Sequence, residues 1–175
     1  MLDKYKYTNK EQKKLLSTMG ILIDTREKSS HIFDWLCKKN INYKVQKLDQ
    51  GDYSFYLPAN KELDIDRDLY FDKEYAIERK GSLEELSTNM TKDRQRLKNE
   101  FAQHKGKMIL LIENANYEDI CKGNYKSQYN NRSYLASLHS MSSEFNIPFI
   151  FSPNQEYTPI FVYFHFYYYL RNIIK

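Results

Sequence analysis

Apolar residues fall in short blocks along the chain, and the blocks predict strands and helices in turn. The run at 107–113 is continuously apolar, which is typical of a central parallel strand covered on both faces. Other blocks alternate or are short, as in strands that bury one face. The segments predicted as strands are 20–24, 43–48, 52–57 (with Gly51 in the turn before it), 69–80 as one strand or a pair, 107–113 and 147–151.

Helical spacing of apolar residues predicts the remaining elements. Ser82 with Glu85 has capping-box spacing, and Thr158-Pro159 is a cap followed by proline at the first helical position. The predicted helices are 30–40, one opening at Ser82, 91–104, 132–145 and 158–174. Alternating strands and helices indicate an α/β fold with a mixed sheet. We expect one domain over 19–175, preceded by a Lys-rich arm or short helix at 1–18.

Composition narrows the class of protein without fixing its function. The 175 residues are 41% hydrophobic and 29% charged with a net charge of +4, which suits a globular domain and permits a nucleic-acid partner. Cys37 and Cys121 lack the spacing of a disulfide framework or a zinc site, and none of the four histidines has a partner spacing. The N-terminal residues have no apolar core and the longest apolar run is short, so we expect neither a signal peptide nor a membrane span. We therefore expect a cytoplasmic protein of a bacterium or phage.

The most specific chemistry lies in 75–80 together with Asp52. Side chains alternate along a strand, so Glu78 and Lys80 would point the same way, roughly 6–7 Å apart. Asp52 would add a second carboxylate from a neighbouring strand. Two hard oxygen ligands and a cation at the phosphate are the minimum set for metal-dependent hydrolysis of a phosphodiester. Taken singly, a Gly-Asp turn or a surface Glu–Lys pair would be ordinary.

Four ordered motifs give a resemblance to a known family. They are Ile23-Asp24-Thr25-Arg26-Glu27, Gly51-Asp52-Tyr53, Ile77-Glu78-Arg79-Lys80, and Ser82-Leu-Glu-Glu-Leu86 followed by Asp93-Arg94. This set resembles the nuclease domain of the XPF-type structure-specific endonucleases, whose signature is GD, a gap, ERK and an acid four residues on. Here that acid is Glu84 instead of the family's aspartate. The family's tandem helix-hairpin-helix module has no counterpart in these 175 residues, so we expect a shorter member that resembles the phage-type proteins.

The resemblance implies a restriction-endonuclease-like fold and hydrolysis with Mg²⁺ or Mn²⁺. It implies that Asp52 and Glu78 are metal ligands, helped by the main-chain carbonyl of Arg79. Lys80 would orient the attacking water and stabilise charge on the phosphate, because a lysine acting as general base would need a strongly lowered pKa. Asp24 would hold a second metal or an outer water, although a strand-end aspartate can also simply cap a turn.

Further residues are expected to support the site or to bind DNA. Arg26 is a candidate phosphate clamp, and Glu27 would orient Arg26 or Lys80. Glu84 is a supporting acid. Arg94 and Arg96 lie on the charged helix after the catalytic strand and are candidate DNA contacts, with a solvated helix face as the plain alternative.

The last predicted helix is aromatic on nearly every face. Its aromatic residues are Phe161, Tyr163, Phe164, Phe166, Tyr167, Tyr168 and Tyr169. A helix that is apolar all round is buried or shared with a partner. Because nuclease domains of the resembled family commonly dimerise, we expect a homodimer through this helix, with an intramolecular core helix as the alternative.

Taken together, the sequence predicts a metal-dependent DNA endonuclease. The resemblance implies branched, flap or fork DNA as substrate, in recombination, repair or replication. One alternative is a restriction-like or defence nuclease that cuts linear duplex DNA. The other is a DNA-binding module that has lost catalysis, against which the intact Asp52, Glu78 and Lys80 argue.

Overall fold

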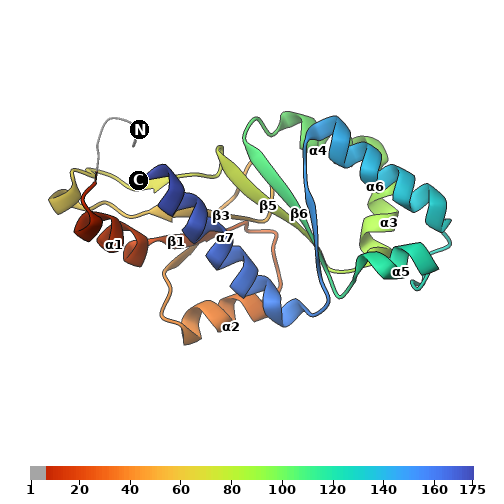
Figure 1. Ribbon diagram of the computed structural model, residues 1–175, viewed down its shortest axis with the longest axis horizontal. Coiled ribbons are helices and arrows are strands. Elements are labelled where there is room, and N and C mark those ends of the chain that lie inside the picture. Colours follow the sequence, from red (N-terminus) through yellow and green to blue (C-terminus); the bar gives the residue numbers. More distant parts are fainter. Residues whose placement is uncertain (1–6) are drawn as a thin grey trace.

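The computed structural model describes residues 7–175, which form a mixed seven-stranded sheet with helices on both faces (Figure 1). The strands are β1 (Gly20–Ile23), β2 (Tyr43–Val45), β3 (Tyr53–Leu57), β4 (Leu69–Tyr70), β5 (Tyr75–Lys80), β6 (Lys107–Glu113) and β7 (Phe149–Ser152). Their order is β2-β1-β3-β5-β6-β7, with β4 beside β3. The predicted fold class, a mixed sheet flanked by helices, is confirmed.

The sheet is parallel at both ends and antiparallel in the middle. β1 pairs parallel with β2, and β5, β6 and β7 run parallel to one another. β3 is antiparallel to β1, β4 and β5. β6 is therefore a central parallel strand, as its continuous apolar run predicted, and β5 lies between the two halves of the sheet.

Helices cover each face of the sheet with its own core. The helices are α1 (Asn9–Thr18), α2 (Ser30–Lys38), α3 (Leu83–Thr91), α4 (Arg94–Gln103), α5 (Tyr117–Lys122), α6 (Asn131–Phe145) and α7 (Thr158–Ile173), with short 3₁₀ turns η1 (Lys61–Leu63) and η2 (Gln155–Tyr157). One core joins α1, α2 and α7 to the sheet, and the other joins α3, α4, α5 and α6 to its opposite face (Figure 1).

Successive residues of the central strands enter opposite cores. On β5, Ile77 packs with the α7 side and Ala76 with the α3 side. On β6, Leu111 and Ile112 divide in the same way. This alternation explains why the run 107–113 has no polar face. No helix among residues 7–175 combines the length and apolarity needed to cross a bilayer.

Several elements differ from their prediction in detail. Residues 9–18 form a helix whose Leu15 and Leu16 are buried, while residues 1–6 of the predicted arm lie outside the described residues. The segment 58–67, between two predicted strands and without a predicted element of its own, contains η1 and buries Leu63 and Ile65. Short apolar contacts of this kind leave no periodic signal, so pattern analysis treats the segment as a loop.

The two predicted helix caps behave differently. The Ser82 hydroxyl accepts a hydrogen bond from Glu85 N at 3.3 Å, as predicted for the start of α3. The prediction for Thr158 was wrong, because Tyr157 is the N-cap residue of α7 and no side chain caps it. The Thr158 hydroxyl donates instead to Glu113 at 2.5 Å. A buried acceptor on another strand thus competes successfully with the local cap.

Candidate active site

A tight turn fixes Asp52 against the central strand β5. Gly51 has a φ of +76°, a conformation that glycine adopts without strain. Asp52 N donates to Ile77 O at 2.9 Å, and the Asp52 carboxylate accepts from Arg79 N at 2.7 Å. Asp52 therefore meets β5 at two points and lies beside Glu78 and Arg79, as the sequence predicted for a carboxylate from a neighbouring strand.

Glu78 and Lys80 lie on the same side of β5, as strand alternation predicted. Lys80 Nζ donates to Glu78 Oε1 at 2.7 Å. The side chain of Lys80 is 9% exposed and that of Glu78 is 15% exposed, so the two do not form a solvated surface pair. A largely buried ion pair needs a reason beyond stability, since desolvation offsets most of its Coulomb energy.

These three residues line one cavity together with two arginines. The cavity has a volume of about 330 Å³ and is lined by Arg26, Asp49, Gln50, Gly51, Asp52, Glu78, Lys80, Arg96 and Glu100. An adjoining hollow of about 310 Å³ adds Glu27, Lys28, Arg79 and Glu85 to several of the same residues. Carboxylates, one ammonium and two guanidinium groups therefore surround the same space, which suits a phosphate group with a bound cation.

The charges in the cavity shift the pKa values in a consistent direction. Burial and the nearby Glu78 carboxylate raise the pKa of Asp52 to about 8. Although burial opposes it, Glu78 and Asp52 together hold the pKa of Lys80 above its ordinary value. The raised pKa keeps Lys80 protonated. The Asp52 and Glu78 carboxylates repel each other, and a bound cation would offset this repulsion.

The donor set fits a hard divalent cation held by few protein ligands. Within residues 7–175, no three His, Cys, Asp or Glu side chains converge in a metal-binding cluster. Asp52 and Glu78 supply two carboxylates, and Asp49, Gln50 and Glu100 of the same lining carry further side-chain oxygens. Mg²⁺ is commonly bound through only one or two carboxylates, with water and phosphate completing its shell.

Asp24 does not face the cavity. It is fully buried, and its two oxygens accept from Arg26 N at 2.8 Å, Arg26 Nε at 2.6 Å and Leu48 N at 2.7 Å. Burial opposes ionisation, but these hydrogen bonds hold the pKa of Asp24 below its ordinary value. The structure therefore uses Asp24 to orient Arg26, whose side chain is 66% exposed at the cavity.

Glu27 binds Arg79 instead of the predicted Arg26 or Lys80. Its carboxylate accepts from Arg79 Nε at 2.8 Å and from Nη2 at 3.2 Å. Despite burial, hydrogen bonds from Arg79 and Ser29 lower the pKa of Glu27 to about 2. The side chain of Arg79 points to the opposite face of β5 from Glu78 and Lys80. The alternation that pairs Glu78 with Lys80 also implies this direction for Arg79.

The two acids after Lys80 have separate places. Glu84, the signature position, accepts from Lys126 N at 2.8 Å and does not line the cavity or the adjoining hollow. Glu85 accepts from Gly81 N at 2.8 Å and lines the adjoining hollow with Asp52 and Lys80. Glu85 therefore lies closer to Lys80 than the family signature suggests, because the signature's fourth residue after the lysine is Glu84. The predicted cap between Ser82 and Glu85 was the one sequence signal that placed Glu85 near the end of β5.

The two arginines of α4 also separate. Arg94 is half-buried, and its guanidinium donates to Ser137 Oγ at 2.8 Å, which joins α4 to α6. Arg96 is 65% exposed and lines the cavity. The geometry favours Arg96 as a phosphate contact, because its ion pairs with Asp93 at 3.6 Å and Glu100 at 4.0 Å are long, whereas Arg94 is hydrogen-bonded to another helix.

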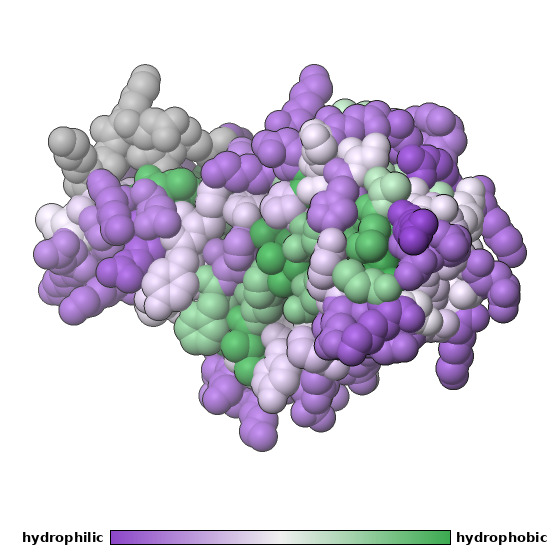
Figure 2. All heavy atoms as spheres, turned by 45° about the vertical axis from the view of Figure 1, so that its right-hand side comes forward, coloured by the Kyte–Doolittle hydropathy of each residue, from purple (hydrophilic) through white to green (hydrophobic). Residues whose placement is uncertain are grey.

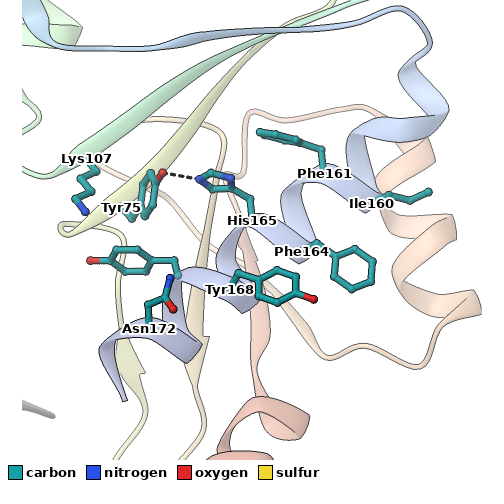
Figure 3. A pocket seen from close by; sticks show the side chains of 9 residues that line it. Tyr75, Lys107, Ile160, Phe161, Phe164, His165, Tyr168 and Asn172 are labelled. Carbon is teal, nitrogen blue, oxygen red and sulfur yellow. Dashed lines mark hydrogen bonds between the residues drawn. The ribbon is translucent and has the colours of Figure 1, made fainter. Parts of the chain in front are cut away.

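A second, aromatic groove lies along α7, away from these residues. It has a volume of about 490 Å³ and includes Tyr75 at the other end of β5 from Lys80. Figure 3 shows His165 of α7 hydrogen-bonded to Tyr75, with a distance of 2.5 Å between Nε2 and Oη. His165 thus has a structural partner in Tyr75.

The molecular surface is not evenly polar. Figure 2 shows one face on which hydrophobic residues gather in the middle, with hydrophilic residues around them. On α7, Ile160, Phe164 and Tyr168 are 38%, 46% and 50% exposed. Their spacing of four residues places them on one side of the helix.

Comparisons with known proteins identify the family and support the fold. Residues 23–164 match the ERCC4 domain family. No curated protein sequence matches. Among solved structures, XPF from Aeropyrum pernix matches with a TM-score of 0.55 and 13% identity, over 88% of this chain and 59% of that chain. The same protein in complex with DNA matches with a TM-score of 0.59 and 15% identity, over 87% of this chain and 63% of that chain. The chain thus spans about three fifths of the length of these structures.

Proposed function

Because this chain belongs to the ERCC4 domain family, we propose that it is a metal-dependent endonuclease that hydrolyses phosphodiester bonds in DNA. The observation that carries the proposal is the convergence of Asp52, Glu78 and Lys80 in one cavity. The fold, which is shared with an XPF protein solved in complex with DNA, supports DNA as the substrate class.

Each cavity residue has a role that follows from its charge. Asp52 and Glu78 would hold one Mg²⁺ or Mn²⁺, with the Arg79 carbonyl as a further oxygen donor. When bound, the ion would supply Lewis-acid stabilisation of the charge that develops on the phosphate. Lys80, held protonated by Glu78, donates hydrogen bonds to the attacking water or to a phosphate oxygen. An ammonium in that state cannot act as the general base.

Two arginines would position the DNA backbone. Arg26, oriented by Asp24, and Arg96 of α4 both line the cavity. A guanidinium group fits phosphate oxygens in a two-pronged geometry. Contacts of this kind make binding salt-dependent and largely independent of base sequence.

We further propose branched, flap or fork DNA as the preferred substrate. This choice rests on the family and on the backbone-directed cations, which would recognise DNA shape in place of sequence. The runner-up is cutting of linear duplex DNA in a restriction-like or defence role. A DNA-binding module without catalysis is disfavoured, because the carboxylates and the lysine share one cavity.

The deciding experiment is cleavage of a labelled 3′-flap, a fork and a plain duplex with Mg²⁺ or Mn²⁺. Asp52→Ala and Lys80→Ala should abolish cutting, while the exposed control variants Asp66→Ala and Lys61→Ala should not change it. Equal cutting of plain duplex would favour the restriction-like role. Salt-sensitive binding by the wild type without cutting in either metal would favour the binding module.

We also propose a homodimer formed through α7. The exposed Ile160, Phe164 and Tyr168 support it, because large apolar and aromatic side chains are enriched at the centres of interfaces. Other residues of α7, such as Val162 and Phe166, are fully buried, so the helix would serve the core with one side and a partner with the other.

A further inference from the structure

A largely buried network of charges lies on the α7 side of β5, and its Glu27 and Arg79 reach the hollow that adjoins the cavity. We propose that Glu113, at the end of β6, is a positioning residue of the nuclease site, which acts by holding the side chain of Arg79. The proposal rests on the proposed function. Glu113 belongs to none of the motifs that carried the family resemblance, and its side chain does not line the cavity.

Three donors from three elements converge on the Glu113 carboxylate. Arg79 Nη1 of β5 donates at 2.7 Å, and Thr158 Oγ1 of α7 donates at 2.5 Å. His31 Nε2 of α2 lies 3.0 Å from the same carboxylate. Glu113 is fully buried, so water does not compete for these three contacts.

Arg79 is gripped from two sides. Glu113 holds one Nη atom, while Glu27 accepts from Nε and the other Nη at 2.8 and 3.2 Å. Five N–H donors in a rigid planar fork leave a guanidinium group little freedom when two carboxylates bind it. The side chain of Arg79 is therefore fixed in position and in rotation.

The main chain of Arg79 transmits this constraint to the cavity. Arg79 N donates to the Asp52 carboxylate at 2.7 Å. Arg79 also lies between Glu78 and Lys80 on an alternating strand, so rotation of its peptide units would swing both neighbours away from the cavity. Holding the side chain of Arg79 on the α7 side of the sheet thus sets the direction of Asp52, Glu78 and Lys80 at the cavity.

Energetics favour positioning over stability as the reason for this network. Burying two carboxylates and a guanidinium carries a large desolvation penalty, and apolar residues of similar volume are often at least as stabilising. A charged network defines one geometry, which a nuclease site needs to about 0.5 Å. Glu113 lies outside the cavity, as do the hydrogen-bonded groups that orient the metal ligands of other proteins.

The test compares Glu113→Gln with Glu156→Gln, the same change at an exposed residue near the start of α7. The readouts are kcat and KM for DNA cleavage, the Mn²⁺ dissociation constant by electron paramagnetic resonance without DNA, and the unfolding temperature. We expect Glu113→Gln to lower kcat or Mn²⁺ affinity about 10–100-fold, as changes behind metal ligands typically do, with KM nearly constant. Glu156→Gln should match the wild type.

A double variant tests whether Glu113 acts through Arg79. Adding Glu113→Gln to Arg79→Gln should cause no further loss of kcat, because the group through which Glu113 acts is already gone. Because Arg79→Gln also takes the partner of the buried Glu27 away, the unfolding temperature is measured for Arg79→Gln and for the double variant, and kcat is compared below both of them.

Two results would overturn the inference. In one, Glu113→Gln lowers the unfolding temperature but leaves kcat and Mn²⁺ affinity within twofold of Glu156→Gln. In the other, the double variant loses much more activity than Arg79→Gln alone. A wild type that neither binds Mn²⁺ nor cuts DNA would overturn the proposed function itself, and the inference with it.

Discussion

Asp24 and Asp52 are adjacent in space but have opposite surroundings. Asp24 N donates to Asp52 O at 2.9 Å, so their backbones are directly joined. The Asp24 carboxylate accepts three hydrogen bonds, two of them from Arg26, whereas Asp52 faces the like charge of Glu78. The charge of an aspartate is thus stabilised by its neighbours at position 24 and opposed by burial and a like charge at position 52.

We predict opposite effects on stability when these aspartates are replaced by asparagine in metal-free protein. Asp52→Asn should raise the free energy of unfolding by about 1 kcal/mol at pH 8, because it removes like-charge repulsion. Asp24→Asn should lower it by about 1–3 kcal/mol, because charged acceptor bonds are lost. Urea unfolding at several pH values measures both, and a destabilised Asp52→Asn would contradict the charge argument.

The pH dependence of this difference has a defined sign. The folded-state pKa of Asp52, about 8, lies above its unfolded value, so its ionisation destabilises the fold progressively between about pH 4 and 8. The advantage of Asp52→Asn should therefore grow over that interval. The lowered pKa of Asp24 stabilises the fold above its unfolded value, and this stability is lost as the pH falls through the folded value.

A second prediction compares Glu84, which occupies the acidic position of the family signature, with Glu85, which lines the hollow beside the cavity. Glu85→Gln should lower kcat about tenfold, because Glu85 lines the hollow beside Lys80 and holds Gly81 N. Glu84→Gln should leave cleavage nearly unchanged, because Glu84 holds the main chain at Lys126. Steady-state kinetics on one flap substrate decides between them. A larger loss in Glu84→Gln would favour the signature position.

At this scale the sequence predicted the groups whose geometry depends on one strand. Alternation along 75–80 was enough to pair Glu78 with Lys80, and strand adjacency was enough to add Asp52. Partners that come from distant elements left no local signal, as with Arg94 on Ser137 and Glu113 on Thr158. Spacing describes a chain segment, and these contacts are created only by its packing.

At the scale of elements, turns and caps matter as much as strands. The turn at Gly51 delivers Asp52 to β5, and it has no room for a side chain. A Cβ atom there would lie 2.8 Å from Ala76 Cβ and 3.2 Å from Ile77 O. Gly123 has a similar φ of +73° after α5, but a Cβ atom there would meet nothing within 4 Å.

These two glycines provide a matched prediction. Gly123→Ala should cost about 1 kcal/mol of stability, the price of a left-handed conformation alone. Gly51→Ala should cost about 2–4 kcal/mol, because overlap with β5 is added, and it should also reduce DNA cleavage by displacing Asp52. Urea unfolding and the flap assay test both variants. Equal losses of stability would show that the contact with β5 is not tight.

Element prediction succeeded where runs were long and failed where they were short. The seven residues of β6 and the sixteen of α7 carry clear patterns. Helix α5 has six residues, too few for a helical period, and it was not predicted. The predicted helix 91–104 begins only at Arg94, because α3 runs on to Thr91. Boundaries of this kind depend on packing between helices that the sequence pattern does not express.

At the scale of the whole molecule, the sheet separates two surfaces with different chemistry. The cavity opens beside α4, whereas the aromatic groove follows α7, which covers the other face of the sheet. DNA and a second subunit could therefore be bound without competing for the same residues.

We predict that the protein in solution has the mass of two 21.1 kDa chains. Phe164→Glu should convert it to one chain, because the charge would be buried at the centre of the interface. Tyr70→Glu, at an equally exposed aromatic residue on β4, should leave the mass unchanged. Light scattering coupled to gel filtration measures all three, and a wild-type mass of one chain would rule out the dimer.

The hydrogen bond from Thr158 to Glu113 spans 45 residues of chain, and it has a consequence for synthesis on the ribosome. A nascent chain that ends before Thr158 already contains Asp52, Glu78 and Lys80. It still lacks Val162 and Phe166, which cover one face of the sheet. If these residues cut DNA as proposed, we expect cutting activity to begin only once α7 has emerged and docked, so that unfinished chains would carry Asp52, Glu78 and Lys80 without cutting DNA.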